Sequence, residues 1–201
     1  MKYPDNIEAL LALEPDYMGL IFWEPSTRFA ALPLPKLEWK NTRKVGVFVN
    51  ASLDEIQRKI EEYELDVVQL HGQESPDFVY EVNNTGVKVI KSFNIYNKFN
   101  FKTLKNFKTL CDYFLFDSKS TLPGGSGTSF NWEVLKNYDM EKPYLLSGGL
   151  DLDKIEILQD FLQSPAGRYC HAVDVNSRFE SAPGLKDIPK IKLFQEKLKT
   201  Q

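Results

Sequence analysis

The stretch FLFDSKSTLPGGSGTSFNW, residues 114–132, combines an acid at the end of an apolar run with a glycine-rich loop. Partial burial at the end of that run would raise the pKa of Asp117 and keep a useful fraction of its carboxyl protonated near neutrality. The loop GGSGT at 124–128 supplies flexible backbone N–H donors able to close over a ligand. Asp117 is therefore a candidate general acid, and an aspartate that only stabilises its loop is an equally simple explanation.

Two later corners place small residues directly after apolar runs. LLSGGLD (145–151) carries Gly148 and Gly149 before a helical stretch, and VDVNSRFESAPG (173–184) carries Asn176 and Ser177. In (β/α)8 barrels, backbone N–H groups and helix N-termini after the last two strands commonly bind phosphate. We expect a phosphate site here, and the simpler alternative is that the two glycines only make a tight turn.

The cysteines and histidines are too scattered to predict a metal site. Cys111 and Cys170 show no CxxC or Cys/His spacing, which argues against zinc and fits buried thiols in a reducing compartment. His71 and His171 are equally isolated, so a hydrogen-bonded loop or core histidine is the simpler explanation of each.

Seven apolar, β-branched or aromatic runs must position these residues, and each is typical of a strand buried on both faces. They cover residues 17–22, 44–50, 66–72, 88–95, 113–118, 144–149 and 172–177. Amphipathic helical stretches lie between them, at 52–63, 75–84, 131–138, 151–163 and 185–199. The first of these has Ser52 as N-cap and Glu55 three residues later, a capping box.

This alternation predicts right-handed βαβ units in either an open doubly wound sheet or a closed barrel. Nearly every run ends in polar or small residues, which a barrel gathers at one mouth. No dinucleotide-type glycine pattern and no GxxxxGK[ST] sequence occurs. We therefore predict one α/β domain over residues 1–201, a (β/α)8 TIM barrel.

The chain opens on a helix rather than on a strand. Pro4 and Asp5 begin this helix, and Ile7, Leu10 and Leu11 form its buried stripe. The spacing of the runs places the preceding strand before Met1, so we expect seven strands with an opening between the last strand and residues 17–22. Unpaired edges favour filling of this opening by a rearranged N-terminus or covering by a second molecule.

Charge and hydropathy exclude several classes of partner. The 25 Lys+Arg and 28 Asp+Glu nearly cancel without runs of like charge, so nothing indicates nucleic acid or an anionic membrane. The N-terminal residues do not resemble a leader, and no stretch approaches the roughly 18 apolar residues of a membrane span. We expect a small-molecule partner, a cytoplasmic location, and a monomer or weak homodimer.

Five ordered motifs resemble the phosphoribosylanthranilate isomerase family of tryptophan biosynthesis, from about Pro4 to Leu198. They are VGVFVN, VVQLHGQES, FDSKSTLPGGSGTSFNW, LLSGGL and VDVNSRFESAPGLKD. The resemblance implies a (β/α)8 barrel that performs an Amadori rearrangement of a phosphosugar, an aminoaldose to an aminoketose, without metal or organic cofactor. It implies that Asp117 is the acid that protonates the furanose oxygen, and that Arg28 holds the anthranilate carboxylate. His71 matches a mouth position, and the phosphate corners match at Gly148, Gly149, Asn176 and Ser177.

The largest departure from the family concerns the general base. The family uses a cysteine in a Lys-x-Cys-Gly-Met motif at the end of the first strand, and no residue here matches it; Cys111 and Cys170 are expected towards the barrel bottom. A start codon assigned to an internal Met is the simplest cause, and we expect this chain to be inactive or impaired. Arg178 is a smaller departure, because many relatives have Gly there.

Two alternatives remain. A degenerate relative would bind a phosphosugar without catalysis, and an in-frame Cys-Gly codon pair upstream of Met1 would argue against it. An aldolase-like Schiff-base enzyme is suggested by Lys91 in KVIKSF, because an interior lysine is activated by desolvation.

Overall fold

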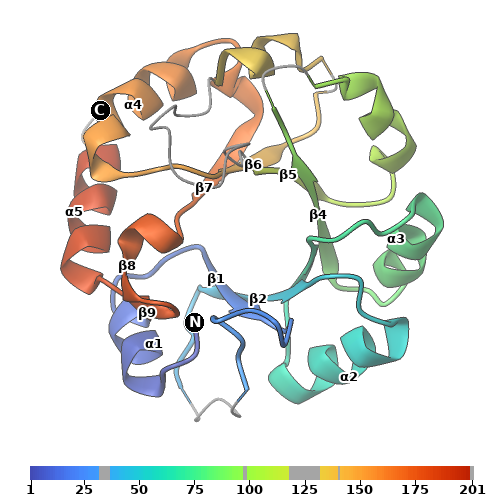
Figure 1. Cartoon of the computed structure of the whole chain (residues 1–201), viewed down its shortest axis with the longest axis horizontal. Helices are drawn as coiled ribbons and strands as arrows, with labels where there is room; N and C mark the ends of the chain where they lie inside the picture. Colours follow the sequence, from blue (N-terminus) through green and yellow to red (C-terminus); the bar gives the residue numbers. More distant parts are fainter. Residues whose placement is uncertain (32–36, 97–98, 118–131, 140, 200–201) are drawn as a thin grey trace.

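The computed structural model describes residues 1–31, 37–96, 99–117, 132–139 and 141–199. Seven parallel strands form one curled sheet in chain order, with the helices around its outside (Figure 1). The strands are β1 Tyr17–Ile21, β2 Arg43–Phe48, β3 Val67–Leu70, β4 Lys88–Asn94, β5 Tyr113–Asp117, β6 Tyr144–Ser147 and β7 Cys170–Asp174. The predicted α/β barrel architecture is confirmed, with one correction: the last strand begins at Cys170 and ends at Asp174, so Asn176 and Ser177 lie beyond it.

The helices follow the predicted stretches with two differences. They are α1 Pro4–Leu11, α2 Leu53–Tyr63, α3 Pro76–Asn83, α4 Ile155–Gln163 and α5 Ile188–Lys199. The segment predicted as a helix at 131–138 is instead the 3-10 helix η2, Trp132–Asn137. The stretch 185–199 begins as a strand, because β9 Leu185–Lys186 pairs with β8 Glu180–Ala182 in an antiparallel hairpin before α5. The other 3-10 helices are η1 Phe101–Phe107, η3 Leu152–Lys154, η4 Gly167–Tyr169 and η5 Ser177–Phe179.

Local capping explains where α2 and α3 begin. The Ser52 hydroxyl accepts a hydrogen bond from the Glu55 amide at 3.2 Å, as the capping box predicts. Ser75 does the same for Phe78 at 3.2 Å, and Pro76 occupies the first helical turn, where its missing N–H costs nothing. Both caps lie directly after strand-to-helix loops, so they fix the lengths of those loops.

The core has two layers on either side of the sheet. The larger apolar cluster includes side chains from the helices and from the outward faces of the strands, among them Ile7, Leu10 and Leu11 of α1. A smaller cluster takes one residue from each of β2 to β6 and fills the inside of the curled sheet: Val45, Val67, Ile90, Leu115 and Leu145. Every residue of β3 and β6 is buried, as expected for strands covered on both faces.

No ladder joins β7 to β1 within the part of the chain that the structure describes, which agrees with the predicted opening. Two sets of contacts lie beside it. The Met1 amino group donates to the Gly19 carbonyl of β1 at 2.9 Å. Outside the strands, Asn6 of α1 exchanges two hydrogen bonds with the Lys186 backbone, at 2.9 and 2.7 Å, which ties α1 to the β8–β9 hairpin (Figure 1).

A side-chain contact spans the same opening at the amino ends of the strands. The Tyr17 hydroxyl of β1 lies 3.0 Å from His171 Nε2 of β7. The His171 ring also stacks on Tyr113, with ring centres 4.6 Å apart. Burial, together with the positive charges of Arg43 and Lys88, lowers the pKa of His171, so the neutral ring is favoured in the folded protein.

This contact predicts a pH-dependent term in stability. The folded protein binds a proton on His171 less readily than the unfolded chain, whose histidine has the ordinary pKa of 6.5. The free energy of unfolding should therefore fall further in the wild type than in His171→Gln between about pH 7.5 and about pH 5.5. Urea denaturation at a series of pH values measures this, and parallel curves for the two proteins would contradict it.

Candidate active site

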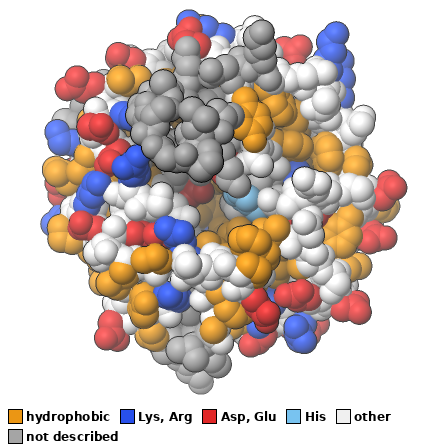
Figure 2. All heavy atoms as spheres, in the orientation of Figure 1, with side chains coloured by type: hydrophobic (Ala, Val, Ile, Leu, Met, Phe, Trp, Pro, Cys, Tyr) orange, Lys and Arg blue, Asp and Glu red, His pale blue; other side chains and the backbone are white. Residues whose placement is uncertain are grey.

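The carboxyl ends of the strands bring polar side chains into one row. Asp117 ends β5, where it lies beside Asn94 of β4 and Ser147 of β6 in the strand register. Ser147 in turn lies beside Asp174, the last residue of β7. The face seen in Figure 2 is hollowed near its centre, and a histidine side chain shows there. Parallel strands that wind in sequence order thus gather the candidate acid with three further polar groups.

His71 points at Asp117 from the end of β3. Its Nε2 lies 3.5 Å from Asp117 Oδ2. Its Nδ1 lies 3.0 Å from the Ser92 hydroxyl and 3.2 Å from Gln69 Oε1. When only Nδ1 carries a proton, Nε2 can accept a hydrogen bond from a protonated Asp117 carboxyl. When both ring nitrogens carry protons, the imidazolium is the counter-ion of the Asp117 carboxylate. His71 is thus positioned to contact the Asp117 carboxyl directly.

Asp174 is a mouth carboxylate that the sequence reasoning did not select. Its Oδ2 accepts a hydrogen bond from the Ser147 hydroxyl at 3.2 Å. Burial raises the pKa of Asp174; the positive charge of Lys186 opposes this shift, and the nearby Asp117 carboxylate adds to it. In the sequence Asp174 lies within the last predicted run, 172–177, and only the structure shows that the strand ends there.

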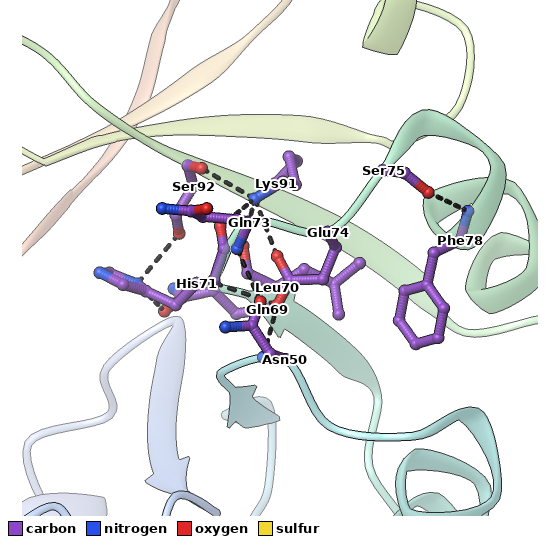
Figure 3. Close-up of polar contacts among 11 residues, drawn as sticks. Asn50, Gln69, Leu70, His71, Gln73, Glu74, Ser75, Phe78, Lys91 and Ser92 are labelled. Atoms are coloured by element: carbon purple, nitrogen blue, oxygen red, sulfur yellow. Dashed lines mark hydrogen bonds and ion pairs between the residues drawn. The ribbon is translucent and has the colours of Figure 1, made fainter.

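A buried ion pair holds the loop that carries His71 (Figure 3). Lys91 and Glu74, whose side chains are 3% and 2% exposed, contact each other at 3.0 Å. The Lys91 ammonium also donates to the carbonyls of Leu70, Gly72 and Ser92, at 3.3, 2.9 and 3.1 Å. This occupied, charged amine leaves no lone pair for attack on a carbonyl, which argues against the Schiff-base alternative.

The other Glu74 oxygen extends the network to the loop after β2. Glu74 Oε1 accepts from the backbone amides of Asn50 and Gly72, both at 3.0 Å. Asn50 Oδ1 accepts from the Gln73 amide at 2.8 Å. A Cβ at Gly72 would lie 2.3 Å from Asn50 Oδ1, so only glycine fits there. The ends of β2, β3 and β4 are therefore held together around one carboxylate.

Arg28 lies in the loop after β1, on the far side of the opening from β7. Its Nε and Nη2 lie 2.8 and 2.7 Å from one oxygen of Glu180, a carboxylate of the β8–β9 hairpin. The Arg28 side chain is 26% exposed, so part of the guanidinium faces solvent. The predicted carboxylate-binding residue is thus already held by a carboxylate of the chain itself.

The two predicted phosphate corners lie next to each other, because β6 and β7 are neighbours. Gly148 and Gly149 have φ of 88° and 67°, the left-handed region that glycine adopts without strain. The Gly149 carbonyl accepts from Lys154 at 2.9 Å, and Asn176 Oδ1 accepts from Lys186 at 2.7 Å. These contacts fit both the tight-turn explanation and a phosphate corner with two lysines beside it.

The remaining candidates lie elsewhere. Burial raises the pKa of both Cys111 and Cys170 to about 12, and each lies at the amino end of its strand, away from the mouth. Ser118 and the 124–128 loop lie outside the described residues.

Among the residues that are described, no three His, Cys, Asp or Glu side chains gather in a way that could hold a metal ion. None of the described helices is long and apolar enough to cross a membrane.

A pocket of about 360 Å³ opens beside the first corner. It lies between α4 and η2, outside the ring of strands, and Trp132, Phe161 and Lys136 contribute to its wall. Gly148 and Gly149 also line it, so the pocket adjoins the predicted phosphate corner, whereas Asp117 is not among its lining residues.

Comparison with known proteins decides the family. Residues 2–197 match the model of the N-(5'phosphoribosyl)anthranilate (PRA) isomerase family. The chain belongs to the PRA isomerase family. The family is one of isomerases of tryptophan biosynthesis, so the resemblance found in the sequence motifs is confirmed. A curated relative from Parabacteroides distasonis, named N-(5'-phosphoribosyl)anthranilate isomerase, is 39% identical and covers 98% of this chain and 90% of its own length.

Solved PRA isomerase structures share the fold. The enzyme from Thermotoga maritima superposes with a TM-score of 0.82 at 28% identity, covering 100% of this chain and 96% of that one. A PRA isomerase in complex with reduced 1-(o-carboxyphenylamino)-1-deoxyribulose 5-phosphate has a TM-score of 0.80 at 25% identity over the same shares of the two chains. The family member described here therefore has the barrel of its relatives, with seven strands in its sheet.

The buried pair behind His71 predicts a specific pattern of stability. Lys91→Met leaves the Glu74 carboxylate buried without its partner, which should lower the free energy of unfolding by about 3–5 kcal/mol. Lys91→Met combined with Glu74→Gln should lose less than Lys91→Met alone, because no unpaired charge stays buried. Denaturant unfolding monitored by circular dichroism measures both.

Lys40→Met is the matched control. Lys40 pairs with Glu14 at 3.3 Å, but the two side chains are 53% and 68% exposed, so its removal should cost no more than about 1 kcal/mol. A double variant less stable than Lys91→Met would show that the pair is not the source of the effect.

Proposed function

We propose that this chain is an N-(5'-phosphoribosyl)anthranilate isomerase whose acid is Asp117. The observation that carries the proposal is the placement of Asp117 at the mouth of the barrel, 3.5 Å from His71. The mouth also has Arg28 on one side of the opening between β7 and β1, and the Gly148-Gly149 and Asn176-Ser177 corners on the other side of that opening. A substrate with a carboxylate at one end and a phosphate at the other fits such a spread of groups.

In the proposed reaction, Asp117 gives its proton to the furanose ring oxygen. The bond between C1' and that oxygen breaks, and the nitrogen lone pair forms a protonated Schiff base with C1'. A base then removes the C2' proton, the electrons move to the nitrogen, and an enolamine forms. The enolamine gains a proton at C1' and loses the proton of its C2' hydroxyl, which gives the aminoketose. Asp117 needs its proton at the start, which the neighbouring His71 can supply or return.

Binding of the two substrate ends is assigned to groups on either side of the opening between β7 and β1. Arg28 offers a planar fork that suits the anthranilate carboxylate. Gly148, Gly149, Asn176 and Ser177 are proposed to bind the phosphate through backbone N–H groups, with no metal or organic cofactor. A cytoplasmic location and a monomer or weak homodimer remain predictions from the sequence.

No residue of the 201-residue polypeptide is assigned as the general base. Its two cysteines lie at the amino ends of strands, and their raised pKa values, about 12, disfavour the thiolate. We infer that this polypeptide by itself isomerises its substrate slowly or not at all. The same observation favours the alternative, a barrel that binds a phosphosugar without catalysis.

Adding a Lys-x-Cys-Gly-Met segment before Met1 should raise the isomerisation rate by a factor of about 10² to 10⁴, the usual contribution of a general base. The loss of substrate fluorescence follows the reaction. Full activity of the 201-residue polypeptide would contradict the assignment of the base. Tight binding of the reduced product analogue without turnover in the extended protein would support the non-catalytic alternative.

In the extended protein, Asp117→Asn should lower kcat by a factor of about 10² to 10⁴ and leave the fold intact, because the amide cannot protonate the ring oxygen. Asp77→Asn, on the exposed start of α3, is the control and should leave kcat unchanged. Turnover by Asp117→Asn at the rate of the parent would exclude Asp117 as the acid.

A further inference from the structure

Glu180 connects the two sides of the proposed binding site. Its Oε2 lies 2.8 and 2.7 Å from Nε and Nη2 of Arg28. Its Oε1 accepts hydrogen bonds from the Lys186 ammonium and from the Gly184 amide, both at 3.2 Å. Lys186 also donates to Asn176 Oδ1 at 2.7 Å. A continuous chain of polar contacts thus runs from Arg28 to the Asn176 corner.

This chain of contacts is buried and held in place by the fold. The Glu180 side chain is 4% exposed and the Lys186 side chain 9% exposed. The antiparallel pairing of Glu180 with Lys186 in the β8–β9 hairpin sets their spacing. The two hydrogen bonds from Asn6 of α1 fix the Lys186 backbone from outside. A surface ion pair would lack these constraints.

We propose that Glu180 is a positioning residue that selects for a carboxylate on the substrate's aromatic ring, by orienting Arg28. This inference rests on the proposed function of the mouth. A guanidinium has five N–H groups, and Glu180 takes the edge formed by Nε and Nη2. Among the residues that the structure describes, none forms a hydrogen bond with Nη1, so a second carboxylate can bind the edge formed by Nη1 and Nη2 through two parallel hydrogen bonds.

Charge explains why a carboxylate is used to hold Arg28. Burial by itself would raise the pKa of Glu180, but the hydrogen bond from Arg28 and the charge of Lys186 outweigh it and lower that pKa. Glu180 therefore stays ionised beside two cations. A neutral residue at this position would leave Arg28 with more rotamers and would remove one of the two carboxylates, Glu180 and Asp174, that compensate the buried charge of Lys186.

Two ligands that differ only in the carboxylate separate this role from a general structural one. The first is reduced 1-(o-carboxyphenylamino)-1-deoxyribulose 5-phosphate, and the second is the same compound with an unsubstituted phenyl ring. Titration calorimetry gives the affinity of each without requiring turnover. Glu180→Gln should weaken binding of the carboxylated ligand by about tenfold or more and change that of the phenyl ligand by less than about twofold.

Arg28→Met should show the same selective loss, and adding Glu180→Gln to it should cause little further loss, because both changes remove one interaction. If Glu180→Gln does not fold, Glu180→Asp replaces it. This variant keeps the negative charge but moves it away from Arg28 by one methylene, and the same selective loss of affinity for the carboxylated ligand is expected. Glu14→Gln, which removes an exposed ion pair with Lys40, is the control and should affect neither ligand.

Equal weakening of both ligands by Glu180→Gln, or weakening of neither, would overturn the inference. If the wild type preferred the carboxylated ligand and Glu180→Gln kept the same preference, the positioning role of Glu180 would be overturned while the proposed function stood. If the wild type bound neither ligand, the proposed function would fail, and this inference with it.

Discussion

Parallel pairing in sequence order is the constraint on which the candidate site depends. Each strand from β1 to β6 pairs in parallel with the next strand along the chain. The carboxyl ends of all seven strands therefore lie at the same end of the sheet. The register then places Asp117 beside Ser147 and Ser147 beside Asp174. Residues separated by long stretches of chain become neighbours without any specific attraction between them, because backbone hydrogen bonds have already aligned their strands.

Two buried ion pairs then fix the loops that leave those strand ends. Lys91 with Glu74 holds the loop that carries His71, and Lys186 with Glu180 holds the hairpin that contacts Arg28. Removing charges from water costs nearly as much as their attraction returns, so such pairs are poor sources of net stability. Their value here is geometric: each carboxylate contacts groups from more than one loop, which restricts the positions of those loops.

The opening between β7 and β1 gives this barrel a different kind of closure. Backbone pairing closes the rest of the curled sheet, whereas side chains such as Tyr17 and His171 meet across the opening. On the mouth side, Arg28 and Glu180 meet across it as well. Side-chain contacts are individually weaker than a ladder and depend on protonation, so this part of the barrel is expected to be its most pH-sensitive region.

The sequence by itself determined the strands and helices, their order, the parallel barrel and the opening, because buried parallel strands read as short apolar runs between amphipathic helices. It also selected Asp117 as a candidate acid from its place at the end of such a run, whereas His71 became a candidate only through the resemblance to the family. It missed the β8–β9 hairpin, whose strands of three and two residues are too short to show periodicity. It began the last strand two residues late and ended it three residues late, because VDVNS alternates like a strand beyond its last ladder pair.

Only the tertiary structure decided which charges pair. Arg28 and Glu180 are 152 residues apart in the chain, and nothing in their local sequence indicates that they meet. Lys91 could be either a reactive amine or a structural cation until the positions of Glu74 and three carbonyls were known. Periodicity reports how a residue lies within its own element, whereas an ion pair depends on how distant elements pack, which only the folded chain shows.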